Sequence, residues 1–385
     1  MLATKGDVVT RTSSSLVRHR AASRRTTRAP QVVALALVGL VTFGATAVAT
    51  QYVRLDGALQ GTEDFTALVG PPVVAPTPAD PEDPGAGRAR TILVMATDDR
   101  SGENEALGGY VAGARSDTTL LVHISADRSR VDVVSVARDT RATIPACNLT
   151  TTPGEKLTRP VTTKFNAAFE RGASAATGDQ TTDLLLGAAC TIYTLQEMTG
   201  VQVDDFVIMD FVGFRDMVDA VGGIDLNVPK AVVPYKHNSL ALDVGPHHMD
   251  GQLALEYARV RYGVGDNSDT QRQPRQQSVV AAVAEKVMSP SVLGDPISLS
   301  RFLQASTASL TLSPGLDSIK EITGLGWSLR SVDRAAITFA MVPAGAGDDG
   351  TVVWTPEADL LWEAIRTDQP ITAISPATPF AQARG

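Results

Sequence analysis

Two arginine–aspartate pairs stand at the ends of two short apolar runs. The pairs are Arg115 with Asp117 and Arg138 with Asp139. The runs, 118–124 and 131–136, are rich in β-branched residues, so each predicts a buried strand, and the polar residues between them are few enough for a hairpin turn. In a hairpin the start of one strand lies beside the end of the next, so the pairs should meet at one sheet edge. They predict a phosphate site with a metal; the alternative is a surface ion-pair cluster.

The spacing within the first pair adds a second expectation. Arg115 and Asp117 are two residues apart where an extended strand begins. Alternate residues of a strand point to the same side, so both side chains should face one way. Arg138 follows a buried strand directly and should lie beside Arg115 across the hairpin.

A second group of anion-binding side chains lies farther along the chain. Arg259 and Arg261 are two residues apart, so they share a side only where the backbone is extended. Arg275 and Gln276 lead into the apolar stretch 278–288, which predicts a helix. A helix N-terminus favours anions, so these groups repeat the chemistry of the hairpin.

The elements that must position these groups alternate along the chain. Further strands are predicted at 92–95, 206–209, 224–228 and 336–342, and further helices at 181–199, 211–221, 251–257, 299–310, 316–329 and 356–366. Asp250 is a predicted helix cap, and Gly200 a predicted helix end. This alternation predicts an α/β (α+β) fold with a mixed central β-sheet flanked by helices.

The apolar surplus on two of these helices favours a lipid channel. Helices 181–199 and 211–221 would line it against the sheet. An ordinary packed core would use the same residues.

The N-terminal part predicts a membrane anchor. Residues 1–30 carry seven basic residues and one acidic residue, and Val32–Ala49 is uncharged throughout. That run approaches the ~20 residues that span a bilayer, and the basic flank places the N-terminus in the cytoplasm. A cleaved signal peptide is the alternative. The predicted segments are a cytoplasmic tail at 1–31, a transmembrane helix at 32–52, a Pro-rich extracytoplasmic linker at 53–90, a catalytic domain at 91–372 and a flexible tail at 373–385.

Charge and cysteine content narrow the function classes. The net charge is −8 although the first 30 residues are basic, so the rest of the chain is strongly acidic and a poor general binder of nucleic acid. The only cysteines are Cys147 and Cys190. Outside the membrane they are expected to form a disulfide; two unrelated buried thiols are the alternative.

Seven segments of the chain, in the same order, resemble the LytR–CpsA–Psr family. They span roughly residues 91–288 and are Asp98-x-Arg100, Arg115-Ser-Asp117-Thr, Ser135-Val-Ala-Arg138-Asp139-Thr, Lys164-Phe-Asn166-Ala-Ala, the stretch from Asp205 to Ile224, Asp250-Gly through Arg259-Val-Arg261, and Arg272-x-x-Arg275-Gln276. The chain departs from the family pattern at Asp99, Ala137 and Pro274.

The resemblance implies a plasma-membrane phosphotransferase of cell wall assembly. Such enzymes join a glycopolymer, carried on a polyprenyl pyrophosphate, to peptidoglycan through a phosphodiester. Asp98 and Asp117 match the carboxylates that bind Mg²⁺ (or Mn²⁺). The groups that match the surroundings of the pyrophosphate are Arg115, Arg138, Arg259, Arg261 and Gln276, with Gln273 and Gln277 as alternatives to Gln276. Asp139 and Arg275 fall beside them, and Arg138, Asp139 and Arg115 are the expected catalytic residues.

Three other functions use the same features. A hydrolase of the lipid pyrophosphate would need the same residues, with water in place of the sugar acceptor. A membrane-anchored envelope regulator and a non-catalytic binder of the lipid carrier are the other two. The short basic N-terminal tail has no helix-turn-helix pattern, so direct DNA binding is not expected.

Overall fold

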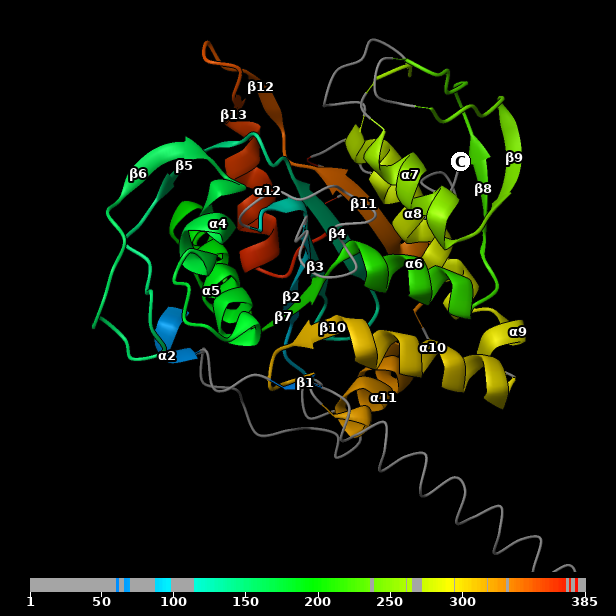
Figure 1. The fold of residues 1–385 in the computed structure, drawn as a ribbon, viewed down its shortest axis with the longest axis horizontal. Helices are drawn as coiled ribbons and strands as arrows, with labels where there is room; N and C mark the ends of the chain where they lie inside the picture. Colours follow the sequence, from blue (N-terminus) through cyan, green and yellow to red (C-terminus); the bar gives the residue numbers. More distant parts are fainter. Residues whose placement is uncertain are drawn as a thin grey trace, which may run out of the picture. The chain divides into compact units, whose positions relative to one another are not determined.

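An eight-stranded mixed sheet runs through the protein (Figure 1). The structure is a computed structural model that describes residues 60–61, 66–69, 87–97, 114–235, 239–260, 262–264, 272–293, 295–316, 318–329, 332–371, 374 and 378–379. All of these belong to one unit, residues 52–385. The predicted cytoplasmic tail and transmembrane helix lie outside the described residues. Among the residues that the structure describes, no helix combines the length and apolar character that crossing a membrane requires.

The predicted hairpin lies at the centre of the sheet. The strand order is β1-β10-β7-β2-β3-β4-β11-β14. The bounds are β1 Gln60–Gly61, β2 Arg90–Thr97, β3 Ser116–Ile124, β4 Val131–Val136, β7 Asp205–Met209, β10 Leu310–Leu312, β11 Ile337–Met341 and β14 Thr378–Pro379. Strand β3 is antiparallel to β2 and β4, whereas β2 is parallel to β7 and β4 to β11. The predicted mixed sheet is therefore confirmed.

Helices cover the sheet, and the described residues also form three separate two-stranded sheets. The helices are α2 Thr66–Val69, α4 Ala167–Ala173, α5 Gln180–Thr199, α6 Phe211–Ala220, α7 Gly251–Arg259, α8 Arg272–Val287, α9 Pro290–Leu293, α10 Pro296–Ser309, α11 Ile319–Ser328, η3 Arg334–Ala336 and α12 Glu357–Arg366. The pairs are β5 Arg141–Ile144 with β6 Val161–Lys164, β8 Ile224–Val228 with β9 Gly245–Met249, and β12 Ala344–Ala346 with β13 Val352–Trp354.

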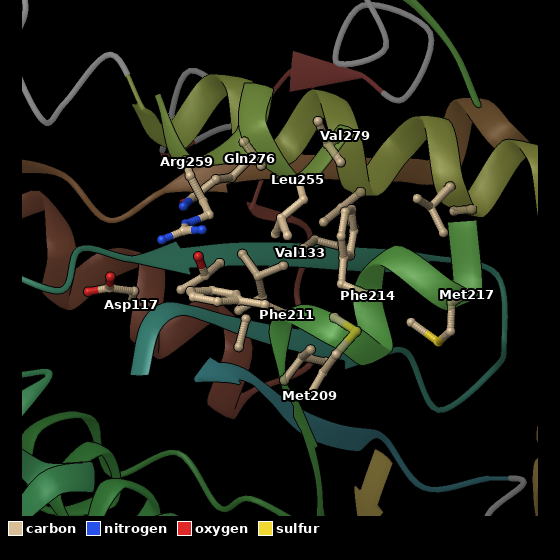
Figure 2. A pocket seen from close by; sticks show the side chains of 18 of the residues that line it. Asp117, Val133, Met209, Phe211, Phe214, Met217, Leu255, Arg259, Gln276 and Val279 are labelled. Atoms are coloured by element: carbon tan, nitrogen blue, oxygen red, sulfur yellow. The ribbon is translucent and has the colours of Figure 1, made fainter. Parts of the chain in front are cut away.

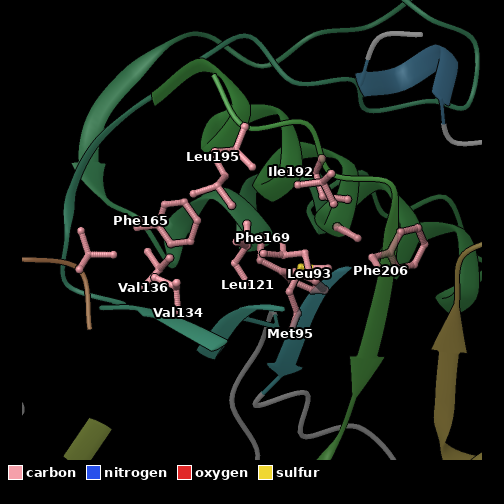
Figure 3. Close-up of a cluster of buried hydrophobic side chains, with 14 of the residues drawn as sticks. Leu93, Met95, Leu121, Val134, Val136, Phe165, Phe169, Ile192, Leu195 and Phe206 are labelled. Carbon is pink, nitrogen blue, oxygen red and sulfur yellow. The ribbon is translucent and has the colours of Figure 1, made fainter. Parts of the chain in front are cut away.

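The pleat of the strands divides the apolar side chains between two faces. Leu93, Leu121 and Val134 point into a core shared with α4, α5 and α12, which Figure 3 shows around Phe169 and Ile192. Their chain neighbours Val94, Leu120 and Val133 belong to the opposite face, which is packed by α8 and α11. The second face also lines a cavity, together with α6, α7 and α8.

Capping residues fix where the helices beside that cavity begin. The Asp210 carboxylate accepts a hydrogen bond from the Gly213 amide (2.7 Å) at the start of α6, and Asp250 accepts one from Leu253 (2.8 Å) at the start of α7. Gly200 ends α5 in the left-handed region, at φ +67°. The predictions for Asp250 and Gly200 are confirmed.

Several predicted boundaries differ from the observed ones. Helix α8 begins at Arg272 rather than at residue 278, so its first polar residues lie within the helix. Residues 60–61 and 66–69, expected in the linker, belong to the folded unit: β1 pairs with β10, and Leu68 is buried in the core. Likewise, 378–379 form β14 on the sheet edge, within the stretch expected to be a flexible tail.

The predicted disulfide is present. Cys147 and Cys190 are bonded, with their Cα atoms 5.3 Å apart. The bond joins the segment after β5 to the middle of α5, inside a small cluster with Ile144 and Ala168.

Candidate active site

A cavity of about 620 Å³ lies between the sheet and helices α6, α7 and α8 (Figure 2). Its lining is apolar over most of its length. The strands contribute Val94, Ala96, Leu120, Val122 and Val133, and the helices contribute Phe211, Phe214, Met217, Leu255, Val279, Val280, Val283, Ala284 and Val287. One expectation was wrong: no residue of α5 lines this cavity, because α5 packs on the opposite face of the sheet.

Polar groups gather at one end of the cavity. Asp117, Arg259, Arg272 and Gln276 belong to its lining. Figure 2 shows Asp117, Arg259 and Gln276 together at one end, with Phe211 and Phe214 between them and Met217. The shape and chemistry suit an amphiphile with an anionic head group and a long apolar body.

A β-bulge turns Asp117 into the cavity. Ala96 pairs with Thr118 and Thr97 with Ser116, so Asp117 has no partner in the register with β2. Because the bulge interrupts the alternation of side chains, Asp117 and Thr118 both line the cavity. The strict period of two that the sequence suggested does not hold here.

A chain of charged groups runs from Asp117 toward β6. Arg138 Nη1 donates to Asp117 Oδ1 (2.9 Å), and its Nε lies 3.5 Å from Asp139 Oδ2. Lys164 Nζ donates to Asp139 Oδ1 at 2.7 Å. The side chain of Arg138 is only 14% exposed. The structure thus brings three predicted site residues into one network and adds Lys164 to it.

Arg115 forms an ion pair with a residue of another element. Its Nε and Nη2 donate to the two carboxylate oxygens of Glu170 on α4, at 2.8 and 3.1 Å. The Arg115 side chain is 53% exposed and does not line the cavity, although Asp117 does. The expectation that both point the same way is therefore wrong, and the bulge is the physical reason.

The sequence profile of the LytR_cpsA_psr family matches residues 77–368, well over half of the chain. The chain belongs to the LytR–CpsA–Psr family.

Two relatives and one solved structure are similar to this chain. The chain is 27% identical to the polyisoprenyl-teichoic acid–peptidoglycan teichoic acid transferase TagU of Enterococcus faecalis, over 56% of the chain and 60% of the relative. It is 27% identical to the corresponding transferase TagV of Bacillus subtilis, over 69% and 61%. The chain thus spans about 60% of the length of these relatives. The fold is similar to that of protein gbs0355 from Streptococcus agalactiae, with a TM-score of 0.55 at 23% identity over 73% and 89% of the two chains.

In this LytR–CpsA–Psr domain, helix α7 delivers Arg259 to the cavity. Arg259 is the last residue of α7, and its guanidinium carbon lies 4.1 Å from the centre of the Phe211 ring. A guanidinium over an aromatic face is held in place while it stays charged. Arg261, its predicted companion, lies outside the described residues.

Helix α8 separates the predicted binding residues by their helical positions. Arg272 and Gln276 are four residues apart, so both face the cavity together with Val279 and Val283. Arg275 instead turns away and donates to the carbonyl of Val260. Arg272 was not among the predicted site residues, and its spacing of four from Gln276 was the signal that could have found it.

Two buried side chains, Gln277 and Tyr257, help to hold helices α7 and α8 in place. Gln277 donates to Ser135 Oγ (2.8 Å) and to the Ala340 carbonyl (3.0 Å), which ties α8 to β4 and β11. Burial raises the pKa of the Tyr257 phenol above its ordinary value, and the charge of Arg275 offsets part of that rise. Both residues are held inside the protein, where they fix the helices that carry Arg259, Arg272 and Gln276.

The predicted metal ligands are only partly described. Asp117 lines the cavity, whereas Asp98 lies outside the described residues. No group of three or more His, Cys, Asp or Glu side chains suited to a metal occurs in the part of the chain that the structure describes. Magnesium commonly takes one or two protein carboxylates and completes its shell with substrate phosphates and water, so Asp117 fits such a site.

Proposed function

We propose that this protein transfers a glycopolymer from a polyprenyl-pyrophosphate carrier to peptidoglycan, forming a phosphodiester bond. The observation that carries the proposal is the cavity, which is apolar along its length and has Asp117, Arg259, Arg272 and Gln276 at one end. The names of the relatives supply the substrate class, because TagU and TagV are teichoic acid transferases that act on peptidoglycan.

The apolar part of the cavity suits the polyprenyl tail. Its walls are aliphatic and aromatic side chains from both the sheet and the helices. A long hydrocarbon gains stability in proportion to the area that it removes from water. Burial of the tail would therefore hold the pyrophosphate at the polar end without any directional contact to the tail.

The polar end suits the pyrophosphate. One guanidinium group can bind two phosphate oxygens at once, and it stays charged. Arg259, Arg272 and Arg138 lie at or beside this end of the cavity. In the reaction, a hydroxyl oxygen of the acceptor attacks the phosphorus that carries the glycopolymer. The bond from that phosphorus to the bridging oxygen breaks, and polyprenyl phosphate leaves. The arginines would stabilise the charge that grows on this leaving group.

The proton of the attacking hydroxyl needs an acceptor, and we assign this role of general base to Asp139. Its carboxylate lies between Lys164 Nζ (2.7 Å) and Arg138 Nε (3.5 Å), and these two contacts fix its position. Mg²⁺ or Mn²⁺ bound by Asp117, with Asp98 as a second ligand, would neutralise phosphate charge.

The setting that we propose is the outer face of the plasma membrane. The uncharged run at 32–49 would span the bilayer once, with the basic tail in the cytoplasm and the catalytic domain outside. The Cys147–Cys190 bond is in keeping with an oxidising compartment. The partners are the lipid-linked glycopolymer, the peptidoglycan acceptor and the membrane, with no nucleic acid.

The test is a transfer assay with defined substrates. Purified full-length protein in detergent is given a polyprenyl pyrophosphate carrying a radiolabelled oligosaccharide, a divalent cation and peptidoglycan fragments. We expect label joined to peptidoglycan through a phosphodiester, together with free polyprenyl phosphate. Release of oligosaccharide phosphate without any joined product would identify a hydrolase. Binding of the lipid with no turnover would identify a carrier-binding protein or regulator.

A further inference from the structure

Two exposed tyrosines lie on two loops that are joined by a backbone hydrogen bond, and the second of these loops follows Arg259. Tyr235 is 44% exposed and Tyr262 is 42% exposed. Their ring centres are 6.3 Å apart, and the ring planes are tilted by 40°. We call this pair the tyrosine platform. Exposed aromatic side chains that gather in one place are typical of binding surfaces.

The backbone fixes the platform before any ligand arrives. The Val233 amide donates to the Gly263 carbonyl at 2.9 Å, which joins the two loops. Gly263 has φ +81°, and a Cβ atom there would lie 2.1 Å from the Val233 carbonyl oxygen. Only glycine permits this close approach.

Buried valines anchor both loops. Val232 precedes Tyr235 by three residues, and Val260 and Val264 flank Tyr262 in the sequence. All three valines are buried in one apolar cluster with Leu242. The loops that carry the two rings are therefore held in place, which lowers the entropy lost when a ligand binds.

We propose that the tyrosine platform binds the sugar residues of the donor, next to its pyrophosphate. This inference rests on the proposed function and adds the part of the substrate that the cavity does not hold. The faces of sugar rings carry C–H groups with partial positive charge, and the face of an aromatic ring is negative, so the two stack. The tyrosine hydroxyls can also hydrogen-bond to sugar hydroxyls.

Position favours the donor over the acceptor. Tyr262 follows Arg259 by three residues, so their Cα atoms are at most about 11 Å apart. Arg259 lines the polar end of the cavity. The first donor sugar is bonded directly to the pyrophosphate, so it must lie within one sugar length of that end. A peptidoglycan acceptor has no such covalent constraint.

The experiment compares two lipids on the same variants. One is a short-chain polyprenyl pyrophosphate carrying a disaccharide, and the other is the same lipid pyrophosphate without sugar. The variants are Tyr235→Ala and Tyr262→Ala, each with its Phe counterpart, which keeps the ring. Trp327→Ala is the matched control, since Trp327 is an exposed aromatic residue (57%) on α11. Melting temperatures confirm that every variant is folded.

We expect each Ala variant to weaken binding of the disaccharide lipid by about 3- to 10-fold, while the Phe variants retain most of it. Binding of the sugar-free lipid should not change in any variant. Equal affinities of wild type and Ala variants for the disaccharide lipid would overturn the platform. So would a raised KM for peptidoglycan with unchanged donor affinity, because the sugars bound would then be those of the acceptor.

Failure of the proposed function has a different signature. A hydrolase or carrier-binding protein would still bind both lipids, so the comparison of variants stands, but it would join no label to peptidoglycan. If the cavity does not take the lipid pyrophosphate at all, wild-type protein binds neither lipid. In that case titration with the soluble disaccharide 1-phosphate, which needs no lipid cavity, decides the platform by itself. Weaker binding of this probe to the Ala variants would support the platform, and equal binding would overturn it.

Discussion

At the scale of single residues, the two arginines of the predicted arginine–aspartate pairs have unequal surroundings. Arg138 is mostly buried between Asp117 and Asp139, whereas Arg115 is exposed and paired with Glu170. A buried ion pair costs more to break than an exposed one, because it leaves an uncompensated charge behind. Substitutions of these two arginines should therefore differ in their effect on stability.

Arg138→Ala should lower turnover by about 10²- to 10³-fold, the usual loss for one donor that stabilises transition-state charge. Lys should restore little, since it lacks the planar fork that binds phosphate. The variant should also unfold more easily, by about 1–3 kcal/mol, because Asp117 and Asp139 lose their shared partner. Urea unfolding and lipid-pyrophosphate turnover on one sample measure both effects. Wild-type turnover per folded molecule would refute the catalytic assignment.

Arg272 and Arg275 form a matched pair on α8. Arg272 lines the cavity, whereas Arg275 binds the Val260 carbonyl. Arg272→Ala should therefore weaken binding of a lipid pyrophosphate by about 10-fold or more, the loss of a charge-assisted hydrogen bond. Arg275→Ala should mainly reduce the free energy of unfolding, by about 1–3 kcal/mol. Binding titrations and urea unfolding of both variants check this; the opposite pattern would exchange their roles.

At the scale of elements, turns and cross-links hold the hairpin and α5 in place. The β3–β4 turn is built around Asp127, whose Oδ1 accepts from Ser125 Oγ (2.7 Å), Ser129 Oγ (2.7 Å) and the Ser129 amide (3.0 Å). These hydrogen bonds, Ser129 first, lower the pKa of Asp127 from 3.8 to about 2. The turn lies at the end of the hairpin opposite the Asp117–Arg138 pair.

This lowered pKa makes the turn sensitive to acid. A carboxylate whose pKa falls on folding stabilises the protein above its unfolded pKa, and the effect is lost as pH drops from about 4 to about 2. Asp127→Ala should therefore reduce stability at pH 7, by no more than about 1 kcal/mol because the group is exposed. At pH 2 the variant and wild type should converge. Asp127→Asn is the control that keeps an acceptor without a charge; urea midpoints at both pH values test the prediction.

The disulfide should stabilise α5 against the segment after β5. Cys147→Ser combined with Cys190→Ser should lower the free energy of unfolding by about 2–4 kcal/mol, since the cross-link limits the unfolded chain. Thiol titration of the unfolded, unreduced wild type should find no free thiol. Two reactive thiols, or a variant as stable as wild type, would contradict this.

At the scale of the whole molecule, the chain joins the fold before its Pro-rich stretch, the part of the predicted linker from Pro71 to Pro84. Strand β1 pairs with β10, and Leu68 of α2 lies in the main core at 7% exposure. Residues that precede the Pro-rich stretch therefore contribute to the stability of the domain. Only residues 53–59 then separate β1 from the predicted membrane segment.

Leu68→Ala in the full-length protein tests this arrangement. Removing a buried leucine side chain typically costs about 2–5 kcal/mol, so a loss in that range is expected in urea unfolding. Leu360→Ala is the matched control, because Leu360 is 58% exposed on α12 and should change stability by less than about 0.5 kcal/mol. Equal effects of the two substitutions would mean that α2 does not pack in the core.

The sequence by itself determined the elements and the family of this protein. The runs at 118–124 and 131–136 became β3 and β4, and most helices end within a few residues of their predicted bounds. Period and capping are local properties, written in neighbouring residues, so a single sequence reveals them. The motifs around Arg138 and Arg259 likewise identified the LytR–CpsA–Psr family before any fold was known.

Only the tertiary structure decided which side chains meet. Asp117 turns into the cavity and Arg115 away from it because a bulge forms against β2, and a bulge depends on the partner strand. Arg272 lines the cavity instead of the predicted Arg275. Helix α8 begins before its apolar stretch, so residue 272 lies on the same helical face as Gln276. Helix α5 packs on the face of the sheet opposite the cavity. The sequence does not specify this face, because an apolar helix fits either side of a sheet equally well. Register, helix start and choice of face are set by contacts between segments distant in sequence, which local patterns do not encode.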